Sequence, residues 1–134
     1  MKIIKISILA AFFGLMSFAT LPTEGNPTVK TASASAIAWK NDVIELGQIT
    51  QNKPQAIVFE FKNTGTSDIL ITNVKPACGC TATDYTKTPI KLGQNAVINA
   101  TYNAAAKGAF TKTVTVTTNN ESTPKVLTFK GTVI

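Results

Sequence analysis

The most regular pattern of polar and apolar positions in the chain lies at residues 110–118. Threonine occupies every odd position from 111 to 117, and Val114 and Val116 occupy even positions between them. Successive side chains of a strand point to opposite faces of a sheet, so this alternation predicts a strand with one face toward a core and one toward solvent. Residues 55–62 alternate in the same way, and their apolar side carries Ile57, Phe59 and Phe61.

Similar short runs, rich in β-branched and aromatic residues, recur about every ten to fifteen residues from position 37 onward. Turn-forming residues separate them, and none has the period of an amphipathic helix. The predicted strands are 37–49 (interrupted at Asn41-Asp42), 55–62, 69–74, 81–85, 96–102, 110–118 and 126–133. About seven short strands predict an all-β, immunoglobulin-like antiparallel β-sandwich, with a closed barrel as the alternative.

Bulky apolar side chains on the inward faces of these strands are expected to form the core between two sheets. Antibody domains join their sheets through two cysteines far apart in sequence, but the two cysteines here, Cys78 and Cys80, are one residue apart. Packing must therefore hold the sheets together. The expected core residues are Trp39, Phe59, Phe61, Ile71, Ile98, Tyr102, Phe110, Val116 and Phe129.

The first 19 residues have a different character. Lys2 and Lys5 precede an apolar run at 6–18, which is shorter than the roughly 20 residues of a membrane-spanning helix. Ser17-Phe18-Ala19 fits a signal-peptidase site. We therefore predict a signal peptide at 1–19, a flexible linker at 20–36 and the sandwich domain at 37–134.

This organisation predicts export. No cysteine directly follows the apolar run, so a lipid anchor at that point is not expected. The rest of the chain contains no second long apolar run. The mature protein is expected to be periplasmic or extracellular, without a membrane span.

Charge and composition exclude several classes of function. The chain carries 13 basic residues, all lysine, against seven acids, and it has no histidine. The lysines are scattered and arginine is absent, which argues against a nucleic-acid partner. Without histidine, Ser-His-Asp and Cys-His catalysis and histidine-built metal sites are impossible. The sequence therefore predicts a protein that is not an enzyme and uses no cofactor.

The candidate site is Cys78-Gly79-Cys80-Thr81, just after Pro76 ends an apolar run. One interpretation is a local disulfide between Cys78 and Cys80, which export favours and the flexible Gly79 permits. A second is a pair of packed thiols, because a free cysteine behaves as a small hydrophobic side chain. In either case no metal is bound.

A third interpretation is a soft-metal site, in which two thiolates hold Cu(I) or half of a zinc site. Without histidine, the remaining ligands would have to be Asp84, Glu60, backbone atoms or a second chain. A closed site within one chain is therefore not expected.

Three consecutive motifs resemble a known family. Phe59-x-Phe61-x-Asn63-x-Gly65, Ile69-x-Ile71-x-Asn73-Val74 and Cys78-Gly79-Cys80-Thr81 are similar to DUF1573, a domain family of unknown function in exported Bacteroidetes proteins. The resemblance covers about residues 44–133 and includes Pro89-Ile90-x-Leu92-Gly93, Gly108-x-Phe110-x-Lys112 and Gly131-x-Val133. It implies an immunoglobulin-like fold similar to the ASH and major-sperm-protein domains, which are non-enzymatic interaction modules, and it implies no activity.

These observations predict an exported, non-catalytic binding or envelope module. Its partner is expected to be another envelope protein or a second copy of itself, bound at a sheet edge by strand addition or at the loop 78–85. The alternative is a thiol-redox or copper-handling domain that uses Cys78-Gly79-Cys80.

Overall fold

The computed structural model describes Gly14 and residues 35–134. Residues 1–32 and 33–134 form separate units, and only the second is described at length. The predicted signal peptide at 1–19 and almost all of the predicted linker at 20–36 lie outside the described residues. Both stay predictions.

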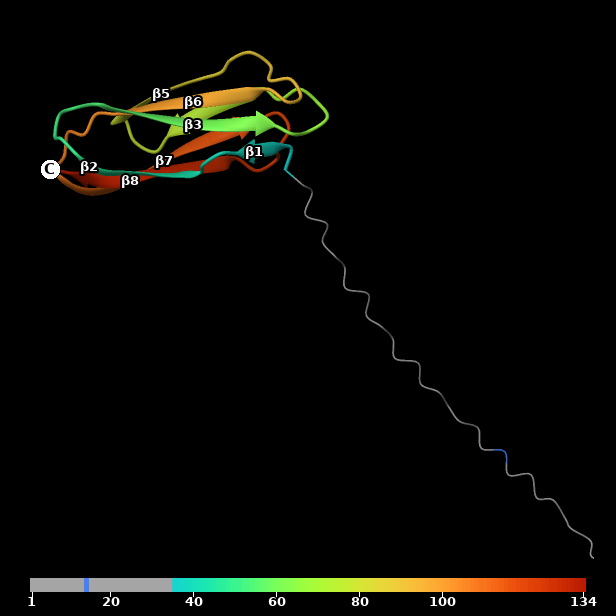
Figure 1. Cartoon of the computed structure of the whole chain (residues 1–134), viewed down its shortest axis with the longest axis horizontal. Helices are drawn as coiled ribbons and strands as arrows, with labels where there is room; N and C mark the ends of the chain where they lie inside the picture. Colours follow the sequence, from blue (N-terminus) through green and yellow to red (C-terminus); the bar gives the residue numbers. More distant parts are fainter. Residues whose placement is uncertain (1–13, 15–34) are drawn as a thin grey trace, which may run out of the picture. The chain divides into compact units, whose positions relative to one another are not determined.

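The described residues form eight strands in two packed sheets (Figure 1). One sheet has the order β1-β3-β6-β5 and contains β1 (Ile37–Trp39), β3 (Gln55–Asn63), β6 (Asn95–Tyr102) and β5 (Thr81–Tyr85). The other has the order β2-β8-β7-β4 and contains β2 (Val43–Ile49), β8 (Lys125–Val133), β7 (Gly108–Thr118) and β4 (Ile71–Pro76). The immunoglobulin-like sandwich predicted from the sequence is confirmed.

The structure has eight strands, one more than predicted, because the predicted strand 37–49 forms two separate strands, β1 and β2. Trp39 pairs with Phe61 in one sheet, and after Asn41-Asp42 the chain enters the other sheet, where Val43 pairs with Thr128. All pairs are antiparallel except β2 and β8, which run parallel. The polar interruption in the sequence is thus a change of sheet.

The core lies between the sheets and contains nearly all of the residues expected there. Phe59, Ile98 and Phe129 are completely buried. Trp39 is the exception among the expected core residues, because it is only half-buried and packs against Phe61 with 4.8 Å between the ring centres. It lies in the short strand β1, where the chain is about to leave the sheet.

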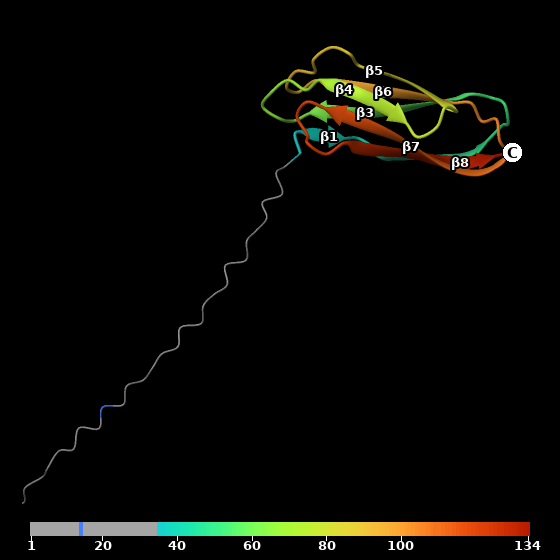
Figure 2. The same cartoon turned by 180° about the vertical axis from the view of Figure 1, so that it is seen from behind.

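The two ends of the sandwich, seen from opposite sides in Figures 1 and 2, carry different loops. At one end, residues 50–54, 77–80 and 103–107 come together: Asn52 N–H donates to Ala104 C=O at 2.9 Å, and Asn103 N–H donates to Cys80 C=O at 3.1 Å. We call this the cysteine end. The C-terminal residue also lies there, since its carbonyl accepts from Gln51 N–H at 3.0 Å.

The opposite end, which we call the Asn63 end, is built around one buried amide. Asn63 is completely buried, and its Nδ2 donates to Ser67 C=O at 2.9 Å and to Ile90 C=O at 2.8 Å. Its Oδ1 accepts from Gly65 N–H at 3.0 Å. This side chain therefore ties the loop after β3 to the loop before β6.

Candidate functional site

The predicted site is the turn that carries the chain from one sheet to the other. Pro76 ends β4, and Thr81 begins β5, which is an edge strand of the opposite sheet. Proline cannot donate to a strand ladder, which is why the strand ends there. Ala77 N–H donates to Thr113 C=O at 2.9 Å, and Thr81 N–H donates to Cys78 C=O at 3.4 Å. Backbone hydrogen bonds thus hold the turn at both of its ends.

The two cysteines meet across this turn. Their Cα atoms are 5.3 Å apart, within the roughly 4.4–6.8 Å that disulfides span, and their sulfur atoms lie at bonding distance. Both residues are half-buried, and Gly79 between them is exposed. This geometry is compatible with a local bridge, the first of the three interpretations drawn from the sequence. The oxidation state of the pair stays a prediction.

Thr81 lies directly beneath the cysteine pair. Its side chain is only 4% exposed, and its Oγ1 is 3.9 Å from the sulfur of Cys78 and 3.9 Å from that of Cys80. Strand pairing with Tyr102 fixes its position. The sequence singled out Thr81 only as part of the motif; its place between the two sulfurs follows from the turn and could not be predicted.

Two residues at the cysteine end have backbone conformations that sequence reasoning missed. Asn52 has φ of 56° and Ala104 has φ of 53°. Asparagine adopts this left-handed region readily, but alanine is uncommon there. Ala104 is completely buried, and its carbonyl accepts the hydrogen bond from Asn52 N–H. The tertiary contacts of this end therefore hold Ala104 in place.

The three loops of the cysteine end contain basic residues and no acids. Lys53 and Lys107 lie in two of them, and Lys75 is the penultimate residue of β4. Outside this end, some acids are paired with lysines. The carboxylate of Asp42 accepts a hydrogen bond from Lys125 at 3.0 Å, and this bond, together with the lysine charge, lowers the pKa of Asp42. The charged side chains of the three cysteine-end loops are therefore all basic.

The structure does not bring the possible additional metal ligands to the cysteines. Asp84 is four residues along β5 from Cys80, about 13 Å in an extended strand, and pairs with Lys87 at 3.7 Å. Glu60 pairs with Lys40 at 3.3 Å. Nowhere in the part of the chain that the structure describes do three Cys, Asp or Glu side chains gather as a metal site would require.

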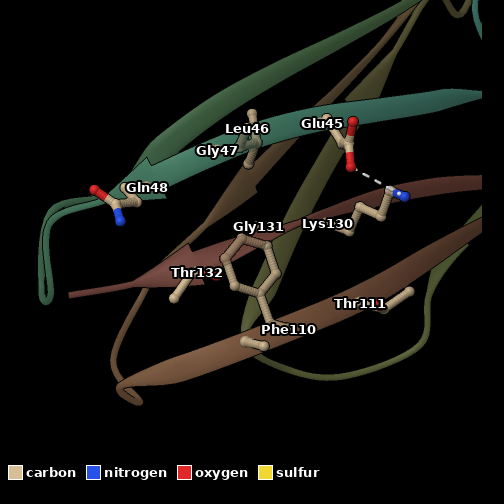
Figure 3. A pocket seen from close by; sticks show the side chains of 10 residues that line it. Glu45, Leu46, Gly47, Gln48, Phe110, Thr111, Lys130, Gly131 and Thr132 are labelled. Atoms are coloured by element: carbon tan, nitrogen blue, oxygen red, sulfur yellow. Dashed lines mark ion pairs between the residues drawn. The ribbon is translucent and has the colours of Figure 1, made fainter.

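A second surface feature is a groove of about 740 Å³ on the sheet that contains β2 and β8 (Figure 3). Glycine at position 131 lets the backbone pack closely at this groove, since a Cβ there would lie 2.7 Å from the Gly47 carbonyl oxygen and 3.0 Å from the Phe110 ring. The two charged residues that line it, Glu45 and Lys130, pair with each other at 3.1 Å. Their charges are therefore already matched, and the groove is a weaker candidate than the turn.

Within the described residues, no helix is long and apolar enough to cross a membrane. A family model described as "Protein of unknown function (DUF1573)" matches residues 37–133. None of the curated proteins matches the chain.

Solved structures with the same fold share little sequence with the chain. A protein of unknown function from Porphyromonas gingivalis W83 is 11% identical, with a TM-score of 0.62 over 72% of this chain and 46% of that one. An ASH/PapD-like domain of human CEP192 is 11% identical, with a TM-score of 0.59 over 74% of this chain and 85% of that one. The VesB protease of Vibrio cholerae is 11% identical, with a TM-score of 0.60 over 74% of this chain and 32% of that one.

At these identities the similarity establishes the fold alone. The chain also spans less than half the length of the Porphyromonas protein and about a third of the protease. No activity is carried over from either of them.

Proposed function

Because the chain belongs to the DUF1573 family of proteins of unknown function, we propose a role from its surface: it is an exported, non-catalytic binding module that takes up an extended segment of another envelope protein along β5. The supporting observation is a comparison of strand edges. An exposed edge presents unpaired backbone groups that can pair with another chain, and proteins usually blunt such edges with bulges, proline, lysine or shortness.

Three of the four sheet edges in the described part of the chain carry such protection. β1 has three residues. The register of β2 shifts between Glu45 and Gln48, next to Gly47 with its φ of 65°. β4 has a register shift after Ile71 and ends in Pro76. Each of these edges is poorly suited to a further strand.

β5 carries no bulge, proline or lysine along its five residues Thr81–Tyr85, and its one charged residue is Asp84. It pairs with β6 in unbroken register over its whole length. Thr86 N–H donates to Val97 C=O, and Cys80 C=O accepts from Asn103 N–H, so the even-numbered residues bond to β6. By the alternation of antiparallel ladders, the N–H and C=O groups of Thr83 and Tyr85 point away from the sheet, toward an added strand.

The side chains beside this edge indicate the chemistry of the partner. Tyr85 and Cys80 are partly buried and pack against the core at the opening between the two sheets. Ala82 and Asp84 are exposed on the outer face. An added strand would therefore place apolar side chains toward Tyr85 and polar ones outward, which requires a segment with alternating polarity. The fixed turn before Thr81 holds the edge in place before binding, which reduces the entropy lost on association.

A second copy of the chain is the other possible occupant. Antiparallel pairing of two β5 strands would place Thr83 opposite itself and Ala82 opposite Asp84, with no like charges in contact. A five-residue strand pair alone, however, buries much less than the roughly 1,200 Å² of stable interfaces. Self-association through β5 alone is therefore expected to be weak, and the same limit means that a partner segment must also contact residues beside β5.

The test uses two variants of one residue in the full-length exported chain. Thr83→Pro removes the outward N–H without touching the bonds to β6, and Thr83→Ala keeps that N–H. A photo-crosslinking residue in place of Ala82 then captures the neighbour of β5 in the native compartment. We expect capture by Thr83→Ala and not by Thr83→Pro, with equal melting temperatures.

Hydrogen exchange gives the second measurement. In the captured complex, the amides of Thr83 and Tyr85 should exchange more slowly than in the free protein. Equal capture by both variants, or unchanged exchange at these two amides, would show that the partner binds elsewhere. Capture of a second copy alone would replace the proposed partner with self-association.

A further inference from the structure

The buried hydroxyl of Thr81 contacts both sulfurs of a half-exposed cysteine pair. We infer that Cys78 and Cys80 are a reversible dithiol–disulfide pair that exchanges its disulfide with dithiols of other exported proteins, assisted by the hydroxyl of Thr81. This inference does not depend on strand addition at β5, because it requires only the turn.

A bridge at this position contributes little to the stability of the fold. The loop that it closes contains one intervening residue, Gly79, and short loops restrict the unfolded chain least. The turn is also already fixed by backbone bonds from Ala77 to Thr113 and from Asn103 to Cys80. Stabilisation is therefore a poor explanation for the pair.

The pair is accessible to an attacking sulfur. Cys78 and Cys80 are half-buried, and Gly79 is exposed. A Cβ built at Gly79 would meet no atom within 4 Å, so the space above the turn is open. Thiol–disulfide exchange requires such access, because the thiolate approaches one sulfur along the line of the bond that breaks.

Thr81 supplies a hydrogen-bond donor to the sulfur that becomes a thiolate when the disulfide breaks. Its Oγ1 is 3.9 Å from each sulfur. Within residues 35–134, the hydroxyl has no other side-chain hydrogen-bond partner. The residue is only 4% exposed, so water does not replace these contacts readily. A hydroxyl donates more strongly to a thiolate than to a neutral sulfur. Thr81 therefore stabilises whichever sulfur leaves.

The charged side chains of the loops around the turn are basic. Lys53 and Lys107 lie in the loops that hydrogen-bond around the turn, and these loops contain no acid. Positive charge near a cysteine favours the thiolate. No histidine is needed for this chemistry, because the attacking group is the thiolate of the partner.

The exchange proceeds in two balanced steps. A thiolate of the partner attacks one sulfur of the pair, the Cys78–Cys80 bond breaks, and its electrons leave with the other sulfur as a thiolate that accepts a hydrogen bond from Thr81. A second thiolate of the partner then attacks the mixed disulfide and releases the first cysteine as a thiolate. The partner is oxidised to a disulfide and the pair is reduced; the two protons of the partner dithiol pass through water to Cys78 and Cys80.

The first experiment measures whether the pair is reducible in the folded protein. Purified mature chain is incubated with millimolar reduced glutathione, alkylated, and weighed by mass spectrometry. We expect complete reduction, with the fold retained, and reoxidation by oxidised glutathione. A bridge that resists glutathione in the folded protein, or thiols that oxidised glutathione fails to bridge, would overturn the inference.

The second experiment isolates the hydroxyl. Thr81→Val keeps the size of the side chain and removes the donor, Thr81→Ser keeps the donor, and Thr118→Val, at another buried threonine, is the matched control. We expect Thr81→Val to slow disulfide transfer to a reduced two-cysteine peptide about tenfold and to move the pH profile of thiol alkylation to higher pH. Thr81→Ser and Thr118→Val should behave as the unaltered protein. An unchanged pH profile in Thr81→Val would remove Thr81 from the mechanism, and no transfer to the peptide by the unaltered protein would refute exchange.

Discussion

Asn63 and Thr81 are two buried polar side chains at opposite ends of one sandwich, and they are satisfied to very different degrees. The amide of Asn63 makes three hydrogen bonds of 2.8–3.0 Å to backbone groups of two loops. The hydroxyl of Thr81 has two sulfur contacts of 3.9 Å. Buried polar groups are normally paired, so a weakly paired one calls for a reason. The comparison indicates that the Asn63 amide ties two loops of the fold together, whereas the Thr81 hydroxyl is directed at the sulfur pair; among the described residues, the buried Thr118 hydroxyl and the Trp39 indole N–H have no hydrogen-bond partner.

The largest effect is expected from Asn63→Ala. This change leaves the Gly65 N–H and the Ser67 carbonyl without their side-chain partner and removes one of the two hydrogen bonds that the Ile90 carbonyl accepts, and it should lower the free energy of unfolding by about 3 kcal/mol. Urea unfolding measures it, with Asn99→Ala, at an exposed position, as the control. A loss as small as that of the control would mean that the two ends do not differ as described.

Removal of the cysteine pair should cost less. Because the bridge closes a loop around one residue, the Cys78→Ala/Cys80→Ala variant is expected to lose at most about 1.5 kcal/mol of unfolding free energy. The same unfolding experiment, run with the bridged protein and with Cys78→Ala alone, checks this value. A loss above that of Asn63→Ala would make the pair a structural element.

A matched pair of glycine substitutions compares the two ends directly. A Cβ at Gly65 would lie 2.6 Å from the Ala36 Cβ, whereas one at Gly79 would meet nothing within 4 Å. Gly65→Ala is therefore expected to destabilise by about 1 kcal/mol, and Gly79→Ala by less than about 0.5 kcal/mol. Thermal unfolding distinguishes them, and equal melting temperatures would contradict the difference in packing.

The smallest effect concerns pH and the Asp42–Lys125 pair. The hydrogen bond and charge of Lys125 lower the pKa of Asp42 below its ordinary value of 3.8, so the ionised form is favoured in the folded state. The resulting stabilisation is present above that value and is lost as pH falls through the lowered pKa. Asp42→Asn should remove this small part of the acid-side slope, as measured by unfolding between pH 5 and about pH 2. An identical slope in both proteins would mean that the exposed pair contributes nothing.

The strands could be predicted from the sequence because their pattern is local. The alternation at 110–118 gave the inward side of β7 correctly, since Val114 and Val116 are buried, and Pro76 marked the end of β4. The assignment of strands to sheets is not local. Nothing near Asn41-Asp42 shows that β1 and β2 belong to different sheets, or that β2 runs parallel to β8.

The candidate site was predicted only in part for the same reason. Two cysteines separated by a single glycine can be recognised from the sequence alone, so Cys78, Gly79 and Cys80 were identified. The position of the Thr81 hydroxyl depends on how the turn crosses between the sheets and on pairing with Tyr102. The strained Ala104 likewise depends on a contact with Asn52, about fifty residues away in sequence, and no local signal marks it.

The parallel pairing of β2 with β8 has a mechanical consequence. A force that pulls the chain before β2 and after β8 in opposite directions acts on Val43 at the start of β2 and on Val133 at the end of β8. In a parallel pair these points lie at opposite ends of the ladder, so the load shears all of its hydrogen bonds at once and does not unzip them one by one. A domain tethered at one end and gripped at the other would therefore resist extension until this one ladder ruptured.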